Sequence, residues 1–385
     1  MTQLETLKPG WTKVKFGEVV RLCKDRSSDP EADGIERYVG LEHLEPEDLR
    51  IRRWGLVADG TTFTSRFKPG QVLFGKRRAY QRKVAVADFE GVCSGDIYVF
   101  ESSDPRSLLP ELLPFICQTD QFFEYAVGTS AGSLSPRTNW KNLREFDIVM
   151  PPLEKQLRIK ELMISVENTL VHYQKSSFLA RKLFKSILEN LLDPVQQGWK
   201  AKQVGDSFQV SCGGTPKRDK PEYWNGEIPW IKTGEVNFNS IKSTEEHITQ
   251  AGLENSSAKL APINSVIMAL FGQGPTLGRV AILDIEATTN QACAIIHPEE
   301  GYNMRFVYYS LWRQYVRVRA KARGASQPNI NASIVKSLEI PYISIEEQNS
   351  WVDKLDDQLS AMRSIDERIE CTAHLKKRIL NKLFG

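Results

Sequence analysis

Residue patterns that carry catalysis are scarce in this chain of 385 residues. Its six cysteines are scattered, with no CxxC pair and no Cys/His clustering, which argues against a zinc site and against a disulfide framework. We therefore expect reduced, mostly buried thiols. The five histidines show no ligand or triad spacing, and no E-x-K triplet of a nuclease occurs. The only Pro-Pro, in MPPL, precedes a helix instead of forming the Asn/Asp-Pro-Pro-aromatic motif of an amino-methyltransferase.

Long apolar runs are also missing. No stretch of about 18 apolar residues occurs, and the N-terminal MTQLETLKPGW lacks the basic and apolar segments of a secretory signal, so we expect a cytoplasmic protein without membrane contact. MALFGQGPTLGR (268–279) has a loose likeness to a nucleotide-binding glycine loop, but it lacks P-loop spacing and a following Lys-Ser or Lys-Thr. We interpret it as a tight strand-to-strand turn.

The net charge of +3 is too small to identify a nucleic-acid-binding protein, but the charge is unevenly distributed. Two stretches, 60–87 and 301–338, contain no acidic residue, and each contains seven Lys or Arg residues. One stretch falls in each half of the chain. They are either solvated faces of ordinary domains or surfaces that bind an anionic partner.

Segments of the first half recur in the second half. GSLSPRTN (132–139) and GASQPNIN (324–331) are 192 residues apart (324 minus 132), as are KLFKSILENLL (182–192) and HLKKRILNKLF (374–384). GWTKVKFGE and GWKAKQVGD, VLF and VIM, and VAV and VAI match at nearly the same offset. An internal repeat of this length predicts a duplicated module rather than a solenoid.

Each copy combines a mixed region with a long helix. Short apolar or alternating runs separated by Gly, Pro and Asn turns predict an α+β domain in 1–150 and another in 196–340, each with one short helix just before the echoed loop. The segments 151–195 and 341–385 contain predicted helices, 154–192 and 346–384, of about 39 residues and thus about 58 Å. Their apolar stripes are Leu162, Val166, Leu170, Tyr173, Leu183, Ile187 and Leu191 in the first and Leu355, Leu359, Met362, Ile365, Ile369, Leu375, Ile379 and Leu383 in the second.

Each long helix needs a partner along its whole length, because one stripe is apolar and the other flanks are charged. Asp193-Pro194 should end the first helix, and Ser344 with Glu347 has the form of a capping box that starts the second. If the second helix runs back along the first, the pair is antiparallel, the α+β domains lie at opposite ends, and the chain has a pseudo-twofold axis. The alternative is that the second helix points outward and pairs with another subunit.

Basic and aromatic residues are interleaved in both halves. RFKPGQVLFGKRRAYQRK (66–83) and CGGTPKRDKPEYWNGEIPWIKTGE (212–235) combine Lys and Arg with Phe, Tyr and Trp. Lys and Arg neutralise phosphates and donate to guanine edges. Aromatic rings such as Trp230 can stack or wedge, although burial is their default.

With the repeated G-x-x-x-P-x-x-N…P…E-x-Q junction before each long helix, the chain resembles the specificity subunits of type I restriction-modification systems. GGTPKRDKPEYWNGEIPWIKTGEV (213–236) is similar to a frequent version of their second target-recognition domain. The resemblance implies a non-catalytic subunit in which each α+β domain reads one half of a bipartite, asymmetric double-stranded DNA target. The helices would set the spacing and dock two methyltransferase subunits.

The same resemblance implies that no cofactor binds this chain directly. S-adenosylmethionine, ATP and Mg would be held by partner subunits, and restriction/translocase subunits could join the complex. Two alternatives stay open: a coiled-coil scaffold without DNA specificity, and a recognition subunit of a related system that modifies DNA without a restriction motor.

Charge and loop character nominate the DNA-binding residues. In the first domain they are Lys76, Arg77, Arg78, Tyr80, Arg82, Lys83 and Arg137. In the second domain they are Thr215, Lys217, Arg218, Lys220, Lys232, Arg279 and Gln327.

Overall fold

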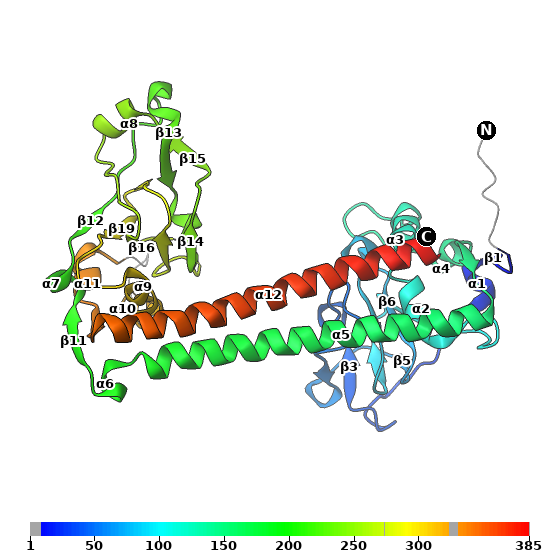
Figure 1. Cartoon of the computed structure of the whole chain (residues 1–385). Helices are drawn as coiled ribbons and strands as arrows, with labels where there is room; N and C mark the ends of the chain where they lie inside the picture. Colours follow the sequence, from blue (N-terminus) through cyan, green and yellow to red (C-terminus); the bar gives the residue numbers. More distant parts are fainter. Residues whose placement is uncertain (1–8, 273, 323–329, 385) are drawn as a thin grey trace. The chain divides into compact units, whose positions relative to one another are not determined.

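The computed structural model describes residues 9–272, 274–322 and 330–384 (Figure 1). Two compact units divide the chain, one formed by Met1–Gln174 with Glu367–Gly385 and the other by Lys175–Asp366. The long helices α5 (Leu153–Ser186) and α12 (Ile345–Phe384) are continuous through both units. Each unit therefore combines a mixed helix-and-strand region with part of each long helix. In the described part of the chain, no helix is long and apolar enough to span a membrane.

The first unit contains two four-stranded sheets and a separate strand pair. The pair joins β1 (Thr12–Lys15) to β10 (Asp147–Met150) in antiparallel fashion. One sheet has the order β2-β9-β6-β7 and is antiparallel throughout, with strands Val20–Cys23, Ile97–Ser102, Val72–Gly75 and Val84–Val86. The other has the order β4-β3-β8-β5, with strands Gly55–Leu56, Arg37–Val39, Gly91–Cys93 and Ser65–Phe67. The short helices are α1 (Phe16–Val19), α2 (Leu113–Ile116), α3 (Asp120–Gly128) and α4 (Trp140–Leu143).

The second unit has a similar inventory. Its strand pair joins β11 (Lys200–Gln203) to β20 (Glu339–Tyr342), again antiparallel. A five-stranded sheet has the order β12-β19-β16-β17-β14, with strands Val210–Cys212, Cys293–Ile296, Val266–Ala269, Val280–Leu283 and Asn239–Ile241. A three-stranded sheet has the order β15-β13-β18, with strands Glu246–Ile248, Trp224–Ile231 and Thr288–Thr289. The short helices are α6 (Pro194–Gln197), α7 (Val204–Ser207), α8 (Gln250–Glu254), α9 (Met304–Arg313), α10 (Tyr315–Lys321) and α11 (Ala332–Lys336).

The long helices bury a stripe close to the predicted one but displaced from it at three positions. Leu170, Leu355, Leu359 and Met362 are buried as expected. Leu162, Leu183 and Leu375 are about half exposed, and the prediction for them was wrong. The adjacent residues Met163 and Phe184 take the inward positions at the first two sites and pack in the cores of the two units, and near the third site Leu380, one turn further along α12, is buried. Leu and Met or Phe at adjacent positions are equally apolar, so sequence spacing alone does not distinguish which of the two faces inward.

Polar contacts join the two long helices inside each unit. In the first unit, Lys376 of α12 forms an ion pair with Glu167 of α5. In the second unit, Ser177 of α5 donates a hydrogen bond to Asp366 of α12 at 2.8 Å. In each unit, part of α12 therefore lies against part of α5 of the same chain, so the alternative in which α12 pairs only with another subunit does not describe this structure. The antiparallel course of the whole pair stays a prediction.

The predicted helix ends are confirmed. Ser344 accepts a hydrogen bond from the backbone N–H of Glu347 at 3.2 Å, and the Glu347 carboxylate accepts from the backbone N–H of Ser344 at 3.1 Å. This reciprocal capping box satisfies two amides that the first turn of α12 would otherwise leave unpaired. After α5 and the π-helical turn Ile187–Leu191, the chain breaks at Asp193, which caps α6. The short helices before the echoed loop number two in each unit, not one: α2 and α3, then α9 and α10.

A buried glutamine anchors the start of each long helix. Gln156 is 1% exposed, accepts from the Leu109 backbone N–H at 3.0 Å and donates to the carbonyls of Ser107 and Pro151 at 2.8 and 3.0 Å. Gln348 is also 1% exposed. It accepts from Asn303 N–H at 2.8 Å and donates to the carbonyls of Gly301 and Ile343 at 3.3 and 3.0 Å. These are the glutamines of the two E-x-Q junctions.

Candidate nucleic-acid interface

In the first unit, two loops join into one basic platform. The hairpin loop between β6 and β7 carries Lys76 to Lys83, and the echoed loop carries Arg137. The loops are held together by backbone hydrogen bonds from Arg78 N–H to the Pro136 carbonyl at 2.8 Å and from Thr138 N–H to the Lys76 carbonyl at 2.9 Å. Four of the seven nominated residues, Lys76, Arg77, Arg78 and Arg137, therefore lie where these loops meet, and a fifth, Tyr80, lies on the same hairpin loop.

Asp96 and Ser135 orient these arginines. Arg77 and Arg137 contact opposite carboxylate oxygens of Asp96, at 3.3 and 2.8 Å. Ser135 accepts from the guanidinium groups of Arg77 and Arg78 at 3.2 and 3.4 Å. Burial alone would raise the pKa of the Asp96 carboxyl, but the hydrogen bonds and charges of Arg137 and Arg77 together lower it. Asp96 thus stays ionised and holds two arginines that remain 38% and 52% exposed.

Lys76, Tyr80 and Arg78 differ in accessibility on the same platform. Lys76 lies over the ring of Tyr98 at 4.6 Å and is half-buried, and this burial lowers the pKa of its amine. Tyr80 is 55% exposed at the turn Ala79–Gln81. Arg78 has a left-handed backbone, with φ of 54°, and an exposed side chain. Tyr80 and Arg78 are therefore the members most open to a ligand.

Arg82 and Lys83 make contacts that stabilise the fold. Arg82 forms ion pairs with Glu47 and Asp120, both at 2.9 Å, and lies 4.5 Å from the centre of the Phe123 ring. Lys83 donates to the carbonyl of Leu41 at 2.7 Å. The structure does not bring these two side chains into the platform. Substituting Arg82 would disturb packing as well as any DNA contact, so it is a poor probe of binding.

In the second unit, Arg218 is held between two tryptophans. Its guanidinium carbon lies 3.8 Å from the centre of the Trp224 ring and 4.8 Å from that of Trp230. Glu246 accepts a hydrogen bond from Arg218 at 2.5 Å, and this bond lowers the pKa of the Glu246 carboxyl. Trp230 itself is 2% exposed and donates to the Gly214 carbonyl at 2.9 Å. It is a core residue that supports Arg218 and does not face a ligand.

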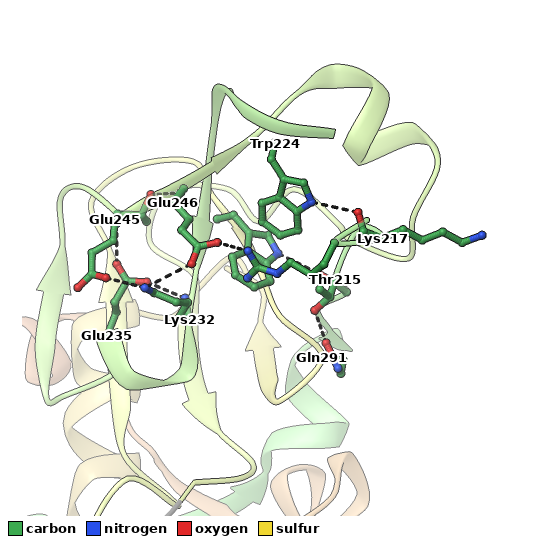
Figure 2. A network of polar contacts seen from close by, with 12 residues as sticks. Thr215, Lys217, Trp224, Lys232, Glu235, Glu245, Glu246 and Gln291 are labelled. Carbon is green, nitrogen blue, oxygen red and sulfur yellow. Dashed lines mark hydrogen bonds and ion pairs between the residues drawn. The ribbon is translucent and has the colours of Figure 1, made fainter. Parts of the chain in front are cut away.

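Lys232 and Thr215 belong to the same polar network (Figure 2). Lys232 pairs with Glu245 at 2.5 Å and with Glu246 at 3.4 Å, and the hydrogen bond that it donates to Glu245 raises the pKa of the lysine. Thr215 donates to the side-chain oxygen of Gln291. Figure 2 also shows the side chain of Lys217 extending away from this network, while its carbonyl accepts from Trp224 at 3.1 Å.

Two nominated residues of the described part of the chain lie outside that network. Lys220 is exposed and 3.7 Å from Glu222. Arg279 directly precedes β17, after the glycine-rich turn of the hairpin that connects β16 to β17, and lies 6.0 Å from the centre of the Phe238 ring. That turn is the predicted strand connection, with positive φ at Gly272, Gly274 and Gly278. Gln327 lies outside the described residues.

Sequence reasoning missed the residues that orient the cations. Asp96, Ser135 and Glu246 are not in basic runs, and they reach their partners only through sheet pairing across tens of residues. The only sequence signal was indirect: a basic stretch this dense needs a counter-charge from elsewhere.

The nucleophilic side chains offer no second site. All six cysteines are free, and burial raises the pKa of Cys93 and of Cys293 to about 12, so both remain protonated thiols. Within the described ranges, no cluster of three or more His, Cys, Asp or Glu residues could hold a metal ion.

Arg218→Ala and Lys217→Ala should have different effects in the second unit. Losing Arg218 removes the packing between two tryptophans and leaves Glu246 with Lys232 alone, so we expect about 1 kcal/mol less stability as well as weaker, less selective DNA binding. Losing Lys217 removes an extended cation, so DNA binding should weaken equally for all sequences. The slope of log affinity against log salt concentration should fall by about 1, and the stability of the protein should not change. Thermal unfolding and duplex titration at several salt concentrations measure both. Unchanged binding by both variants would exclude this surface.

Part of the chain is similar to proteins of known type. Residues 196–371 match the family model of the type I restriction modification DNA specificity domain. The EcoR124I/EcoR124II specificity subunit of Escherichia coli is 30% identical over 183 residues, which is 46% of this chain and 45% of that protein. The chain thus spans less than half the length of this relative. The MjaVIII specificity subunit of Methanocaldococcus jannaschii aligns over 97% of this chain and 92% of its own length at 19% identity.

Solved structures share the fold along the whole chain. A chain from the type I R-M system superposes with a TM-score of 0.64 at 19% identity, covering 98% of both chains. The type I restriction-modification S subunit from M. genitalium superposes with a TM-score of 0.61 at 13% identity, covering 100% of this chain and 98% of that one. Residues 196–371, which make up less than half of the chain, are therefore similar to type I restriction modification DNA specificity domains, and the solved structures show the same fold.

Proposed function

We propose that this chain is the non-catalytic DNA-specificity subunit of a type I restriction-modification complex. The observation that carries the proposal is the specificity-domain match over residues 196–371, a range in which Lys217 and Arg218 are exposed and Lys232 is partly exposed. The mixed regions 1–150 and 196–340 would each read one half of a bipartite, asymmetric target in double-stranded DNA. Oriented arginines supply guanine contacts, and exposed lysines supply phosphate contacts.

Matching local structure in the two units supports a pseudo-twofold repeat. The buried glutamines Gln156 and Gln348 make the same three kinds of hydrogen bond. Asn139 and Asn331 both cap the short helix after the echoed loop, accepting from Lys141 N–H at 2.9 Å and from Ile334 N–H at 3.0 Å. A protein with such a repeat suits the local twofold symmetry of duplex DNA, with half-site spacing set by the helices.

The long helices would dock two methyltransferase subunits. The S-adenosylmethionine would then be bound by those subunits, and ATP and Mg by restriction/translocase subunits where the system has them. This assignment agrees with the sequence, which offers no P-loop and no amino-methyltransferase motif. It also agrees with the cysteines and histidines, which form no ligand cluster in the part of the chain that the structure describes.

A methylation map of a host genome tests the proposal. The map is compared with and without this gene in a host that carries its methyltransferase. We expect one bipartite adenine-methylated motif to disappear when the gene is removed. An unchanged map would contradict the proposal and favour a scaffold protein, which should also show no affinity for duplex DNA at moderate salt.

A further inference from the structure

Leu134 is the most exposed large apolar side chain in the described residues, at 91%. It lies at the tip of the echoed loop, whose base is closed by reciprocal backbone hydrogen bonds between Ala131 and Arg137, at 3.0 and 2.9 Å. Gly132 takes φ of 108°, which lets the chain turn toward the tip. The leucine is therefore presented by a closed loop, not by a free strand of chain.

The residues that follow Leu134 fasten the loop to the basic platform. Ser135 accepts from both Arg77 and Arg78, and the Pro136 carbonyl accepts from Arg78 N–H. Arg137 is tied to Asp96 at 2.8 Å. Leu134 is thus followed by three residues, Ser135, Pro136 and Arg137, whose contacts involve three arginines. Asp96 is the carboxylate that takes part in these contacts.

An apolar side chain in this position has little reason to be there in the free protein. Exposing a leucine forgoes the free energy that its burial would contribute. Leu134 lies on a loop that is fastened to the arginines of the basic platform. Minor-groove proteins use a similar arrangement when they insert a leucine, isoleucine or phenylalanine between base pairs while arginines hold the DNA backbone.

We propose that Leu134 is an apolar wedge that enters the DNA duplex and unstacks one base step in the half-site bound by residues 1–150. Arg78 and Arg137, on either side of the wedge, hold the flanking phosphates. The proposal rests on the DNA-specificity function proposed above and adds a distortion that this chain imposes. The step at which Leu134 inserts would favour flexible pyrimidine–purine sequences, since these are the cheapest to unstack.

The sequence of the second copy supplies a contrast. Aligning GSLSPRTN with GASQPNIN places Ser326 opposite Leu134, at a position outside the described residues. A serine cannot act as an apolar wedge. The distortion should therefore occur in one half-site and be absent from the other, and Leu134→Ser converts the first loop to the residue type of the second.

The test uses the complex assembled with its methyltransferase partner, on duplexes in which 2-aminopurine replaces single adenines of the mapped motif, apart from the methylated ones. We expect fluorescence to rise at one step of one half-site and to return to the duplex level in Leu134→Ser. Affinity should fall about tenfold. The variant loses the burial of the inserted leucine, and this loss is partly offset because the base step no longer has to be unstacked. Leu56→Ser, another exposed leucine of the same unit, is the matched control and should change neither quantity.

Each outcome separates the two proposals. If Leu134→Ser shows the fluorescence and affinity of the wild type, the wedge is overturned. It is also overturned if the variant binds more weakly but the wild-type complex never unstacks a base step. Failure of the wild-type complex to bind the motif would overturn the DNA-specificity function itself. Because Leu134 is 91% exposed, the variant should melt at the wild-type temperature, so a folding defect does not confuse the result.

Discussion

Gln156→Ala should destabilise the first unit by about 3–5 kcal/mol, one of the largest effects of a single substitution expected in this chain. The side chain is 1% exposed and satisfies one backbone N–H and two backbone carbonyls. Alanine removes the partner of the buried Pro151 carbonyl and of two partly buried groups, the Leu109 N–H and the Ser107 carbonyl, and each such group costs up to about 1–3 kcal/mol. The loss should be at the lower end of that sum, because water can reach a cavity at a helix start.

Gln348→Ala is the matched change in the second unit and should cost a similar amount. Its three hydrogen bonds reach the same kinds of group, at 2.8, 3.3 and 3.0 Å. Urea unfolding with separate probes for the two units measures both variants. Gln174→Ala, on an exposed face of α5, is the control and should change stability by less than about 0.5 kcal/mol. A loss below about 1 kcal/mol for either buried glutamine would contradict the reasoning.

The periodic apolar pattern of the sequence predicted the two long helices and where they begin and end. The capping box at Ser344 and the break at Asp193-Pro194 depend on local chemistry, and both are where the sequence placed them. Which side of each helix faces inward was less certain, because Leu162 and Met163 are adjacent apolar residues. Tertiary packing selects between such neighbours, and periodicity averages over them.

The candidate site was predictable in its cations but not in their arrangement. Arg77, Arg78 and Arg137 do lie together, whereas Arg82, in the same basic run, turns to Glu47 and Asp120. The partners of Arg82, Glu47 and Asp120, lie 35 or more residues away in the sequence and reach it only through the tertiary fold. Charge alone therefore could not separate the two groups.

Lys376→Met should cost about 3–5 kcal/mol, because it removes the partner of a buried carboxylate. Lys376 is 9% exposed at its side chain and Glu167 is 20% exposed, and the two form an ion pair between α12 and α5 in the first unit. Without the lysine, the Glu167 carboxylate is left partly buried and without its ion-pair partner, and this costs free energy.

The double variant Glu167→Leu/Lys376→Met should recover most of this loss and approach or exceed wild-type stability. Replacing both charges by apolar side chains of similar volume removes the desolvation cost together with the attraction. Deleting the exposed pair Glu154–Arg158, with side chains 81% and 78% exposed, should cost less than about 1 kcal/mol and serves as the control. Chemical unfolding of the wild type, Glu167→Leu, Lys376→Met and the double variant closes the cycle. Because the pair joins two helices of one chain, the measured stabilities should not depend on protein concentration, whereas a coiled coil between subunits would gain stability as concentration rises.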